Sequence, residues 1–220
     1  MIKPPGIIDN TIELPGRCYA IRMMPHEVDI ADIHDWNQAY VDAMKLIVDG
    51  NVDEGKEILE ELYCRKYNRA GHTLSYGYGA GWFGEPDPKK YLSLVYALVL
   101  KGYSAAFSDY GFYYDCGIGV KKSMRWALYW YRKAADYDDE AQNILGLCYE
   151  EGLGVLKDYE KAYYWFQLAV KNGAGACAEH NLARCFRLGR GISEDKEMAN
   201  KYEALAVKHG FHKKDKGIVI

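Results

Sequence analysis

The sequence has little of what would point to a membrane or to a nucleic acid. Its most apolar stretch, Tyr91 to Leu100, is about half as long as the ~20 residues of a membrane-spanning helix. Basic residues number 28 against 31 acidic residues, a formal net charge of −3. The global positive charge typical of nucleic-acid binding is therefore missing. The composition predicts a folded protein with no membrane span and no nucleic-acid partner.

Cysteine is also sparse, and its spacing excludes a disulfide-dense scaffold. No C-x-x-C pair occurs, whereas small secreted scaffolds carry closely spaced cysteines. The start of the chain, Met-Ile-Lys-Pro-Pro-Gly, lacks the apolar helix of a signal peptide. We therefore expect a cytoplasmic protein whose cysteines are free thiols: Cys18, Cys64, Cys116, Cys148, Cys177 and Cys185.

Motifs for catalysis are missing from the sequence as well. It has no G-x-S-x-G elbow, no H-E-x-x-H and no Cys/His ligand set. Residues 79–84 match the dinucleotide fingerprint G-x-G-x-x-G, but Pro86 and Pro88 follow where a helix should open, which favours a turn between helices. We expect no catalytic residue, no metal and no cofactor.

What the sequence does contain is an internal repeat. The segment Leu145-Gly-Leu-Cys-Tyr-Glu-Glu-Gly-Leu-Gly-Val155 has one counterpart 35 residues earlier, at 110–120, and another 37 residues later, at 182–192. Each copy is followed by a second matching segment, which begins at Ser123, Asp158 and Asp195 respectively. A period of this length with two helical segments is typical of stacked helix pairs.

Each repeat has signals for where its two helices end and begin. Gly152 and Gly189 stand where a helix ends in a left-handed residue. The side chains of Ser123, Asp158 and Asp195 stand where an oxygen can cap the second helix. In that second helix, small residues alternate with rings, and we expect Trp130 and Trp165 to be buried between layers.

The pattern from Ala141 to Phe166, Ala-x3-Leu-Gly-x2-Tyr-x2-Gly-x-Gly-Val-x2-Asp-x2-Lys-Ala-x2-Trp-Phe, resembles the Sel-one-like repeat, a relative of the tetratricopeptide repeat. This resemblance implies an all-α, right-handed α-solenoid of about five stacked antiparallel helix pairs. The expected organisation is an arm (1–30, irregular or a short hairpin), a capping helix pair (31–68), a degraded repeat (69–103), three clear repeats (104–138, 139–174 and 175–210) and a tail (211–220).

The resemblance implies protein–protein interaction rather than catalysis, with the partner bound on the concave surface of the solenoid. The binding residues should be those that vary between repeats on the first helices. A change from acid at Asp115 and Glu150 to base at Arg187 predicts a charge-graded surface. The candidates are Phe107, Phe112, Asp115, Gln142, Asn143, Leu147, Glu150, His180, Arg184 and Arg187.

Three roles remain open for such a module. One is an immunity protein that neutralises a toxin, because small cytoplasmic repeat proteins of this kind resemble some bacterial immunity proteins. Another is a regulatory scaffold or adaptor in a bacterial signalling or envelope-related complex. The third, a regulatory subunit of an enzyme, is the most distant. Catalysis by the chain itself is disfavoured, because only the arm and the tail lie outside the array, and they are too short for a catalytic domain.

Overall fold

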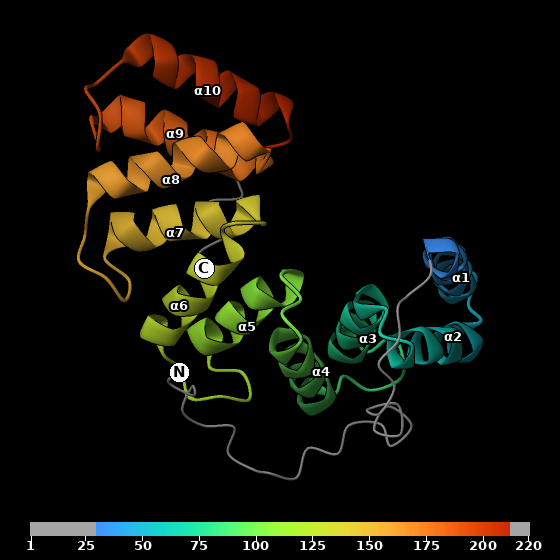
Figure 1. Cartoon of the computed structure of the whole chain (residues 1–220). Coiled ribbons are helices and arrows are strands. Elements are labelled where there is room, and N and C mark those ends of the chain that lie inside the picture. Colours follow the sequence, from blue (N-terminus) through green and yellow to red (C-terminus); the bar gives the residue numbers. More distant parts are fainter. Residues whose placement is uncertain (1–29, 212–220) are drawn as a thin grey trace. The chain divides into compact units, whose positions relative to one another are not determined.

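The computed structural model describes residues 30–211, with side chains from Trp36 onward, so the arm and most of the tail lie outside the described residues. This part of the chain forms ten helices and no strand (Figure 1). In order they are α1 (Ile30–Val48), α2 (Val52–Cys64), α3 (Asn68–Ala80), α4 (Pro88–Leu100), α5 (Ala105–Cys116), α6 (Met124–Ala134), α7 (Asp139–Glu151), α8 (Tyr159–Asn172), α9 (Gly175–Leu188) and α10 (Lys196–Lys208).

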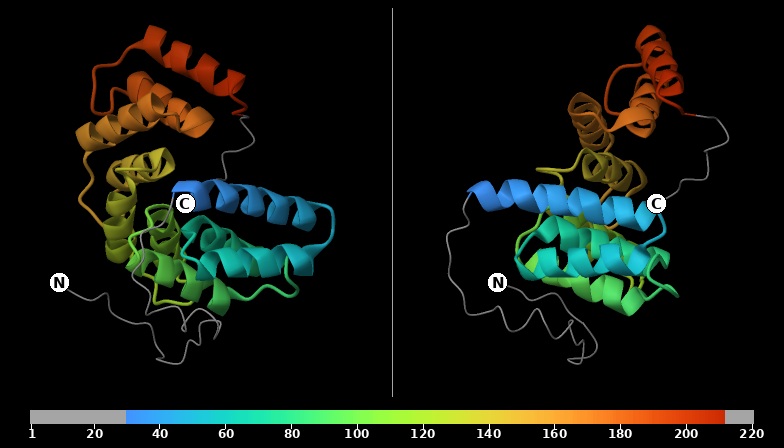
Figure 2. Two further views of the ribbon diagram at one scale, coloured as in Figure 1. Left: turned by 45° about the vertical axis from the view of Figure 1, so that its right-hand side comes forward. Right: turned by 90° about the vertical axis from the view of Figure 1, so that its right-hand side faces the viewer.

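The chain divides into two compact units. Among the described residues, the N-terminal unit comprises 30–106 together with Ile118–Lys121, and it holds α1 to α4. The C-terminal unit comprises Phe107–Gly117 and 122–211, and it holds most of α5 and all of α6 to α10. In the C-terminal unit, α7, α8, α9 and α10 lie one upon the next (Figures 1 and 2). The expected all-α fold of stacked helix pairs is confirmed, whereas its handedness stays a prediction.

The ends of the repeat helices agree with the local signals in the sequence. Asp158 and Asp195 accept hydrogen bonds from the backbone N–H groups of Lys161 and Met198, each at 3.0 Å. Ser123 caps α6 in the same way. Gly152 and Gly189 end α7 and α9 with φ values of +77° and +62°, a region in which a side chain is strained. These expectations are confirmed.

In the first two of the three clear repeats, a glycine on the first helix meets a ring on the second. A Cβ added to Gly146 on α7 would lie 2.4 Å from Cε1 of Phe166 on α8. Gly111 on α5 faces Tyr131 on α6 in the same manner. Phe166 and Tyr131 are fully buried, so the paired helices approach closely around a ring.

The expected burial of two tryptophans is wrong. Trp130 and Trp165 are each only partly buried, and the fully buried ring of α8 is the neighbouring Phe166. Adjacent helical residues point about 100° apart, so an error of one position moves a side chain from the core to its edge. Trp130 lies at that edge against Phe107 and Tyr110, with ring centroids 5.9 Å and 5.1 Å away.

In the N-terminal unit, the glycine-rich segment forms a turn between helices with Gly81 as the cap glycine, as expected from the sequence. Gly79 still belongs to α3, and the helix ends at Gly81, which has a φ of +76°. Asp87 then caps α4 ahead of Pro88. Among the described residues, no helix combines the length and the apolar character needed to cross a membrane.

Candidate functional site

The ten candidate residues lie on α5, α7 and α9 of the C-terminal unit, but they do not share one exposed surface. Asp115, Gln142, Asn143 and Glu150 are buried, with exposed fractions between 0% and 8%. Phe107, Leu147, His180 and Arg184 are half-buried, and Phe112 and Arg187 are exposed. The expectation that the varying positions form a charge-graded surface is therefore wrong at Asp115 and Glu150.

Gln142 joins α7 to α8 of its own repeat and to the end of α6 in the repeat before. Its Nε2 donates to the carbonyl oxygen of Ala135 at 2.7 Å, and its Oε1 accepts from Nδ2 of Asn172 at 3.0 Å. In the next repeat the equivalent residue, Glu179, lies 2.9 Å from Nδ1 of His209. A polar group that is buried needs such partners, so this row serves packing.

Neighbouring positions make contacts both between repeats and within one repeat. Nδ2 of Asn181 on α9 donates to Oδ1 of the buried Asn143 on α7 at 2.9 Å. His180 has Glu203 at 3.1 Å from its Nδ1 and stacks on Phe211 with centroids 4.1 Å apart. Phe211 thus packs against α9 although the sequence placed it in the tail. Burial lowers the pKa of His180, against the raising influence of Glu203.

Glu150 is the centre of the strongest charge cluster in the unit. Its carboxylate is fully buried and accepts hydrogen bonds from Arg184 and from Arg190, the latter at 2.7 Å. Both arginines come from the following repeat, 34 and 40 residues further along the chain. Glu150 therefore ties α7 to α9 and the loop after it, and it is not the exposed charge expected from the sequence.

Asp115 occupies the same repeat position as Glu150 but lacks such partners. It is 4% exposed, and its Oδ2 has no hydrogen-bond partner among the described residues. Burial raises the pKa of this carboxyl group, and the positive charge of Lys122 opposes that rise. Burial and the charge of Asp115 also raise the pKa of the Tyr131 hydroxyl.

Two candidates are exposed. Phe112 on α5 is 46% exposed, and the side chain of Arg187 on α9 is 44% exposed, with Glu203 3.3 Å away. Leu147 on α7 and Arg184 on α9 stand at the repeat positions equivalent to Phe112. We call these four residues (Phe112, Leu147, Arg184 and Arg187) the first-helix face. The binding role of all ten candidates stays a prediction.

Another concave feature was missed from the sequence. A groove of about 590 Å³ lies in the C-terminal unit, between α8 and α10 and above α9, and Tyr164, Lys171 and Tyr202 line it. Its lining comes from three helices, and no single repeat displays it. The one signal in the sequence was that Lys171 and Leu168 differ from their equivalents one repeat earlier, Asp136 and Lys133.

The cysteines with described side chains form no disulfide, as expected, and Cys18 lies outside the described residues. Cys148 and Cys185 fill equivalent buried positions, where burial raises the pKa of each thiol to about 12. A thiol that stays protonated at neutral pH is a poor nucleophile, so both act in packing. In the part of the chain with described side chains, no group of three metal-binding residues comes together.

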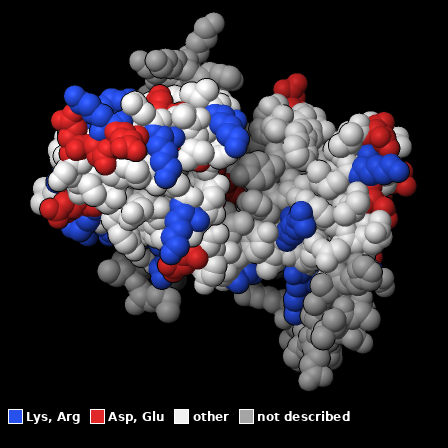
Figure 3. Space-filling model, turned by 90° about the horizontal axis from the view of Figure 1, so that it is seen from above, with Lys and Arg blue, Asp and Glu red and all other residues white. Residues whose placement is uncertain are grey.

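Charge on the C-terminal unit is mixed. In the face that Figure 3 shows, Lys and Arg side chains lie among Asp and Glu side chains instead of forming a field of one sign.

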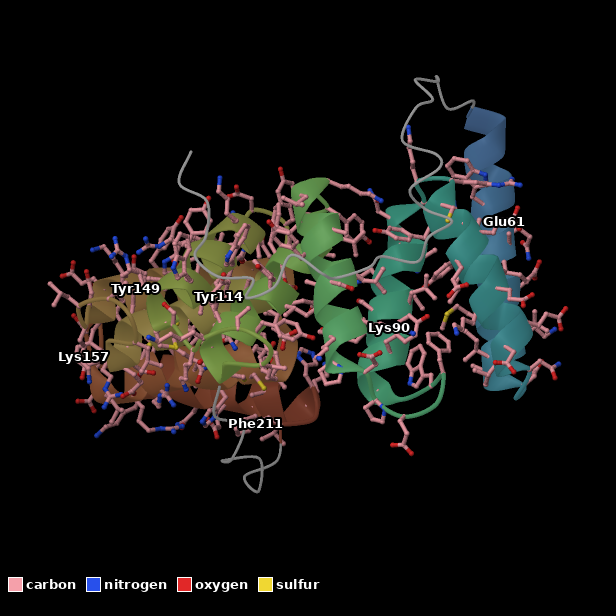
Figure 4. The ribbon with its side chains drawn as sticks, turned by 90° about the horizontal axis from the view of Figure 1, so that it is seen from below. Glu61, Lys90, Tyr114, Tyr149, Lys157 and Phe211 are labelled. Carbon is pink, nitrogen blue, oxygen red and sulfur yellow. The ribbon has the colours of Figure 1, made fainter. Side chains whose placement is uncertain are left out.

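Figure 4 labels Tyr114 and Tyr149, which hold equivalent positions on α5 and α7. The hydroxyl of Tyr149 accepts a hydrogen bond from Arg132 at 2.8 Å. Recurring aromatic positions thus build the stack, while single charges vary.

Comparison with known proteins agrees with this geometry. The family model of the Sel1 repeat matches residues 108–137, 139–173 and 178–211. No curated protein matched the sequence. Among solved structures, the chain is similar to a Sel1 repeat protein from Oxalobacter formigenes, with a TM-score of 0.71 and 23% identity over 82% of this chain and 76% of that one.

A second solved structure is that of a protective antigen present in uropathogenic Escherichia coli strains and displaying an SLR fold. It matches with a TM-score of 0.67 and 28% identity. The match covers 71% of this chain but only 33% of that protein. Sel1 repeats are generally protein–protein interaction modules. Three segments of this chain match the model of this repeat, and the fold is similar to that of Sel1 repeat proteins.

Proposed function

We propose that the chain acts stoichiometrically, without catalysis, by binding a partner protein on the first-helix face. The observation that carries this proposal is the contrast between buried and exposed side chains on the first helices of the repeats. Buried polar side chains fix α7 to α9 from the inside, through Asn143 and Glu150, while Phe112 on α5 and Arg187 on α9 stay accessible. A fixed scaffold that presents an aromatic ring and a guanidinium group suits an interface, since such residues supply much of the binding energy.

The specific partner in this proposal is a bacterial toxin or effector, which makes the chain an immunity protein of the cytoplasm. Its support is the resemblance of small Sel1 repeat proteins to some immunity proteins, the bacterial origin of both structural matches, and the lack of disulfides among the described cysteines. A scaffold or adaptor role, or a regulatory role beside an enzyme, would use the same surface but a different partner.

The test has two steps. The tagged chain is first used to isolate the partner from its native lysate, and the partner is then expressed with and without the chain. An immunity role requires that the partner alone stops growth and that co-expression of the chain restores it. Growth that is unaffected by the partner would contradict the immunity role and favour a scaffold.

The surface is then tested by affinity. Phe112→Ala and Arg187→Ala should each weaken binding about tenfold or more, a typical loss for a central interface side chain. Leu156→Ala and Lys196→Ala are matched controls, because both side chains are highly exposed but lie away from the first-helix face. If both test variants bind as tightly as the controls, the first-helix face is not the binding surface.

A further inference from the structure

The groove between α8 and α10 has the dimensions of a binding site. Its volume of about 590 Å³ falls within the range of pockets that hold a ligand or a few side chains. Tyr164, Leu168 and Lys171 line it from α8. These residues follow one another at intervals of four and three, so they share one face of the helix over about two turns, roughly 10 Å. The groove is therefore long enough to contact about two turns of another helix.

The floor and the far wall of the groove are held in place by the core. Leu182 of α9 forms part of the lining and is only 1% exposed. Tyr202 of α10 stacks on the buried ring of Phe186, with centroids 5.8 Å apart and planes inclined by 3°. The edge of Tyr163 packs against the same phenylalanine. A wall backed in this way keeps its shape before a ligand arrives, which lowers the entropic cost of binding.

The polar groups of the groove favour a ligand with a negative charge. Lys171 is exposed and is the charged member of the described lining. The lining also includes Gln167 and two tyrosines, one of which, Tyr164, is 55% exposed. An apolar floor with an ammonium group at the end of the α8 row fits a segment that carries apolar side chains and then a carboxylate.

The lining of the groove differs from the equivalent place one repeat earlier. One repeat earlier, the positions of Leu168, Lys171 and Tyr202 are held by Lys133, Asp136 and Trp165. At the equivalent place, Lys133 therefore puts a charge where this groove has the apolar Leu168, and Asp136 puts an acid where it has Lys171. One repeat later, Leu205 and Lys208 hold the positions of Leu168 and Lys171 again, so the contrast distinguishes this groove from the preceding repeat only.

We propose that this groove docks an amphipathic helix of a second protein. Two apolar side chains one turn apart would lie over Leu168 and Leu182, between Tyr164 and Tyr202. A glutamate or aspartate on the next turn would pair with Lys171. Helices commonly bind in this way, with apolar anchors at intervals of three or four residues in a groove. The surface differs from the first-helix face, so the proposal does not depend on that face.

The test uses a defined probe with the full-length chain. The probe is a fluorescently labelled, helix-stabilised peptide with leucines at positions i and i+4, glutamate at i+8 and an alanine–glutamine background. A second peptide carries lysine in place of the glutamate, and a third carries serine in place of both leucines. We expect saturable binding of the first peptide, and binding at least about tenfold weaker for the other two. Absence of binding up to about 1 mM would overturn the proposal.

A charge swap locates the binding. Lys171→Glu should weaken the glutamate peptide about tenfold and should favour the lysine peptide instead. Lys208→Glu is the matched control, because Lys208 holds the equivalent repeat position on α10 and is not part of the lining. Equal effects of the two variants would show a general charge effect and overturn the assignment. So would self-association of the wild-type chain that Tyr202→Ala abolishes, since a second copy would then be the occupant.

Discussion

Two consecutive repeats of the C-terminal unit bury a carboxylate at the same repeat position, but only one of the two carboxylates is paired with arginines. Glu150 is enclosed by Arg184 and Arg190, which neutralise it. Asp115 is nearly as buried, yet its Oδ2 has no hydrogen-bond partner among the described residues. The cause lies in the following repeat in each case, because the positions of Arg184 and Arg190 are occupied one repeat earlier by Leu147 and Leu153.

This contrast shows that the energetics of a repeat depend on its neighbour. A buried charge is tolerated when it is paired and hydrogen-bonded, and it costs free energy when it is not. The same acidic position can therefore stabilise one junction between repeats and weaken the next. In a stacked array, where each repeat contacts its neighbours, such differences decide which junction opens first.

The largest effect should come from removal of the paired carboxylate. Glu150→Ala leaves two arginines without their anion, and breaking a buried ion pair from one side typically costs about 3–5 kcal/mol. We expect a loss of that size in the free energy of unfolding, measured by urea denaturation with circular dichroism. Glu151→Ala is the control, since the adjacent side chain is 53% exposed and should change stability by less than about 0.5 kcal/mol. Equal losses would show that Glu150 is not the anchor.

A smaller effect on stability is expected at the glycine that ends the first helix in both repeats. Gly117 and Gly152 end α5 and α7 in the left-handed region, with φ values of +78° and +77°. A β-branched residue is poorly suited to that conformation, so Gly152→Val should cost more than about 1 kcal/mol. Gly117→Val should cost a similar amount, measured in the same way. A loss at only one of them would mean that the repeats differ in backbone as well as in charge.

The unpaired carboxylate should give an effect of the opposite sign. Asp115→Asn removes a buried charge, and we expect the variant to be about 1 kcal/mol more stable than the wild type at pH 7. The pKa of Asp115 is raised in the folded state, so the folded chain binds the proton more tightly than the unfolded chain does. The wild type therefore loses stability relative to the variant as the pH rises from the unfolded pKa through the folded pKa.

Unfolding curves of both proteins between pH 3 and pH 8 measure this difference. The gain from Asp115→Asn should be complete above the folded pKa and should vanish below the ordinary pKa of an aspartate, about 3.9. A gain that does not change with pH would assign the effect to packing instead of charge. A loss at pH 7 would show that attraction to Lys122 outweighs the cost of burial.

Glu150 and the helix ends near it show which features could be predicted from the sequence and which could not. The helix ends at Gly152 and the cap at Asp158 depend on neighbours within a few residues, so local patterns were enough to predict them. The surroundings of Glu150 depend on arginines 34 and 40 residues away, which no local pattern connects to it. The sequence therefore predicted the repeat fold but misplaced Glu150 on the surface. The groove was missed for the same reason, because Tyr164, Leu182 and Tyr202 meet only after three helices stack.

The smallest effect is expected in the third repeat, where the position of Asp115 and Glu150 is held by a base. The side chain of Arg187 is exposed and meets Glu203 at 3.3 Å near the surface. Exposed ion pairs contribute little to folding, so Arg187→Ala should change the free energy of unfolding by less than about 0.5 kcal/mol. The measurement is the same urea titration, performed beside Glu150→Ala. A cost comparable to that of Glu150→Ala would mean that Arg187 also holds the stack together. A negligible cost would leave its side chain available for a partner, as the proposed first-helix face requires.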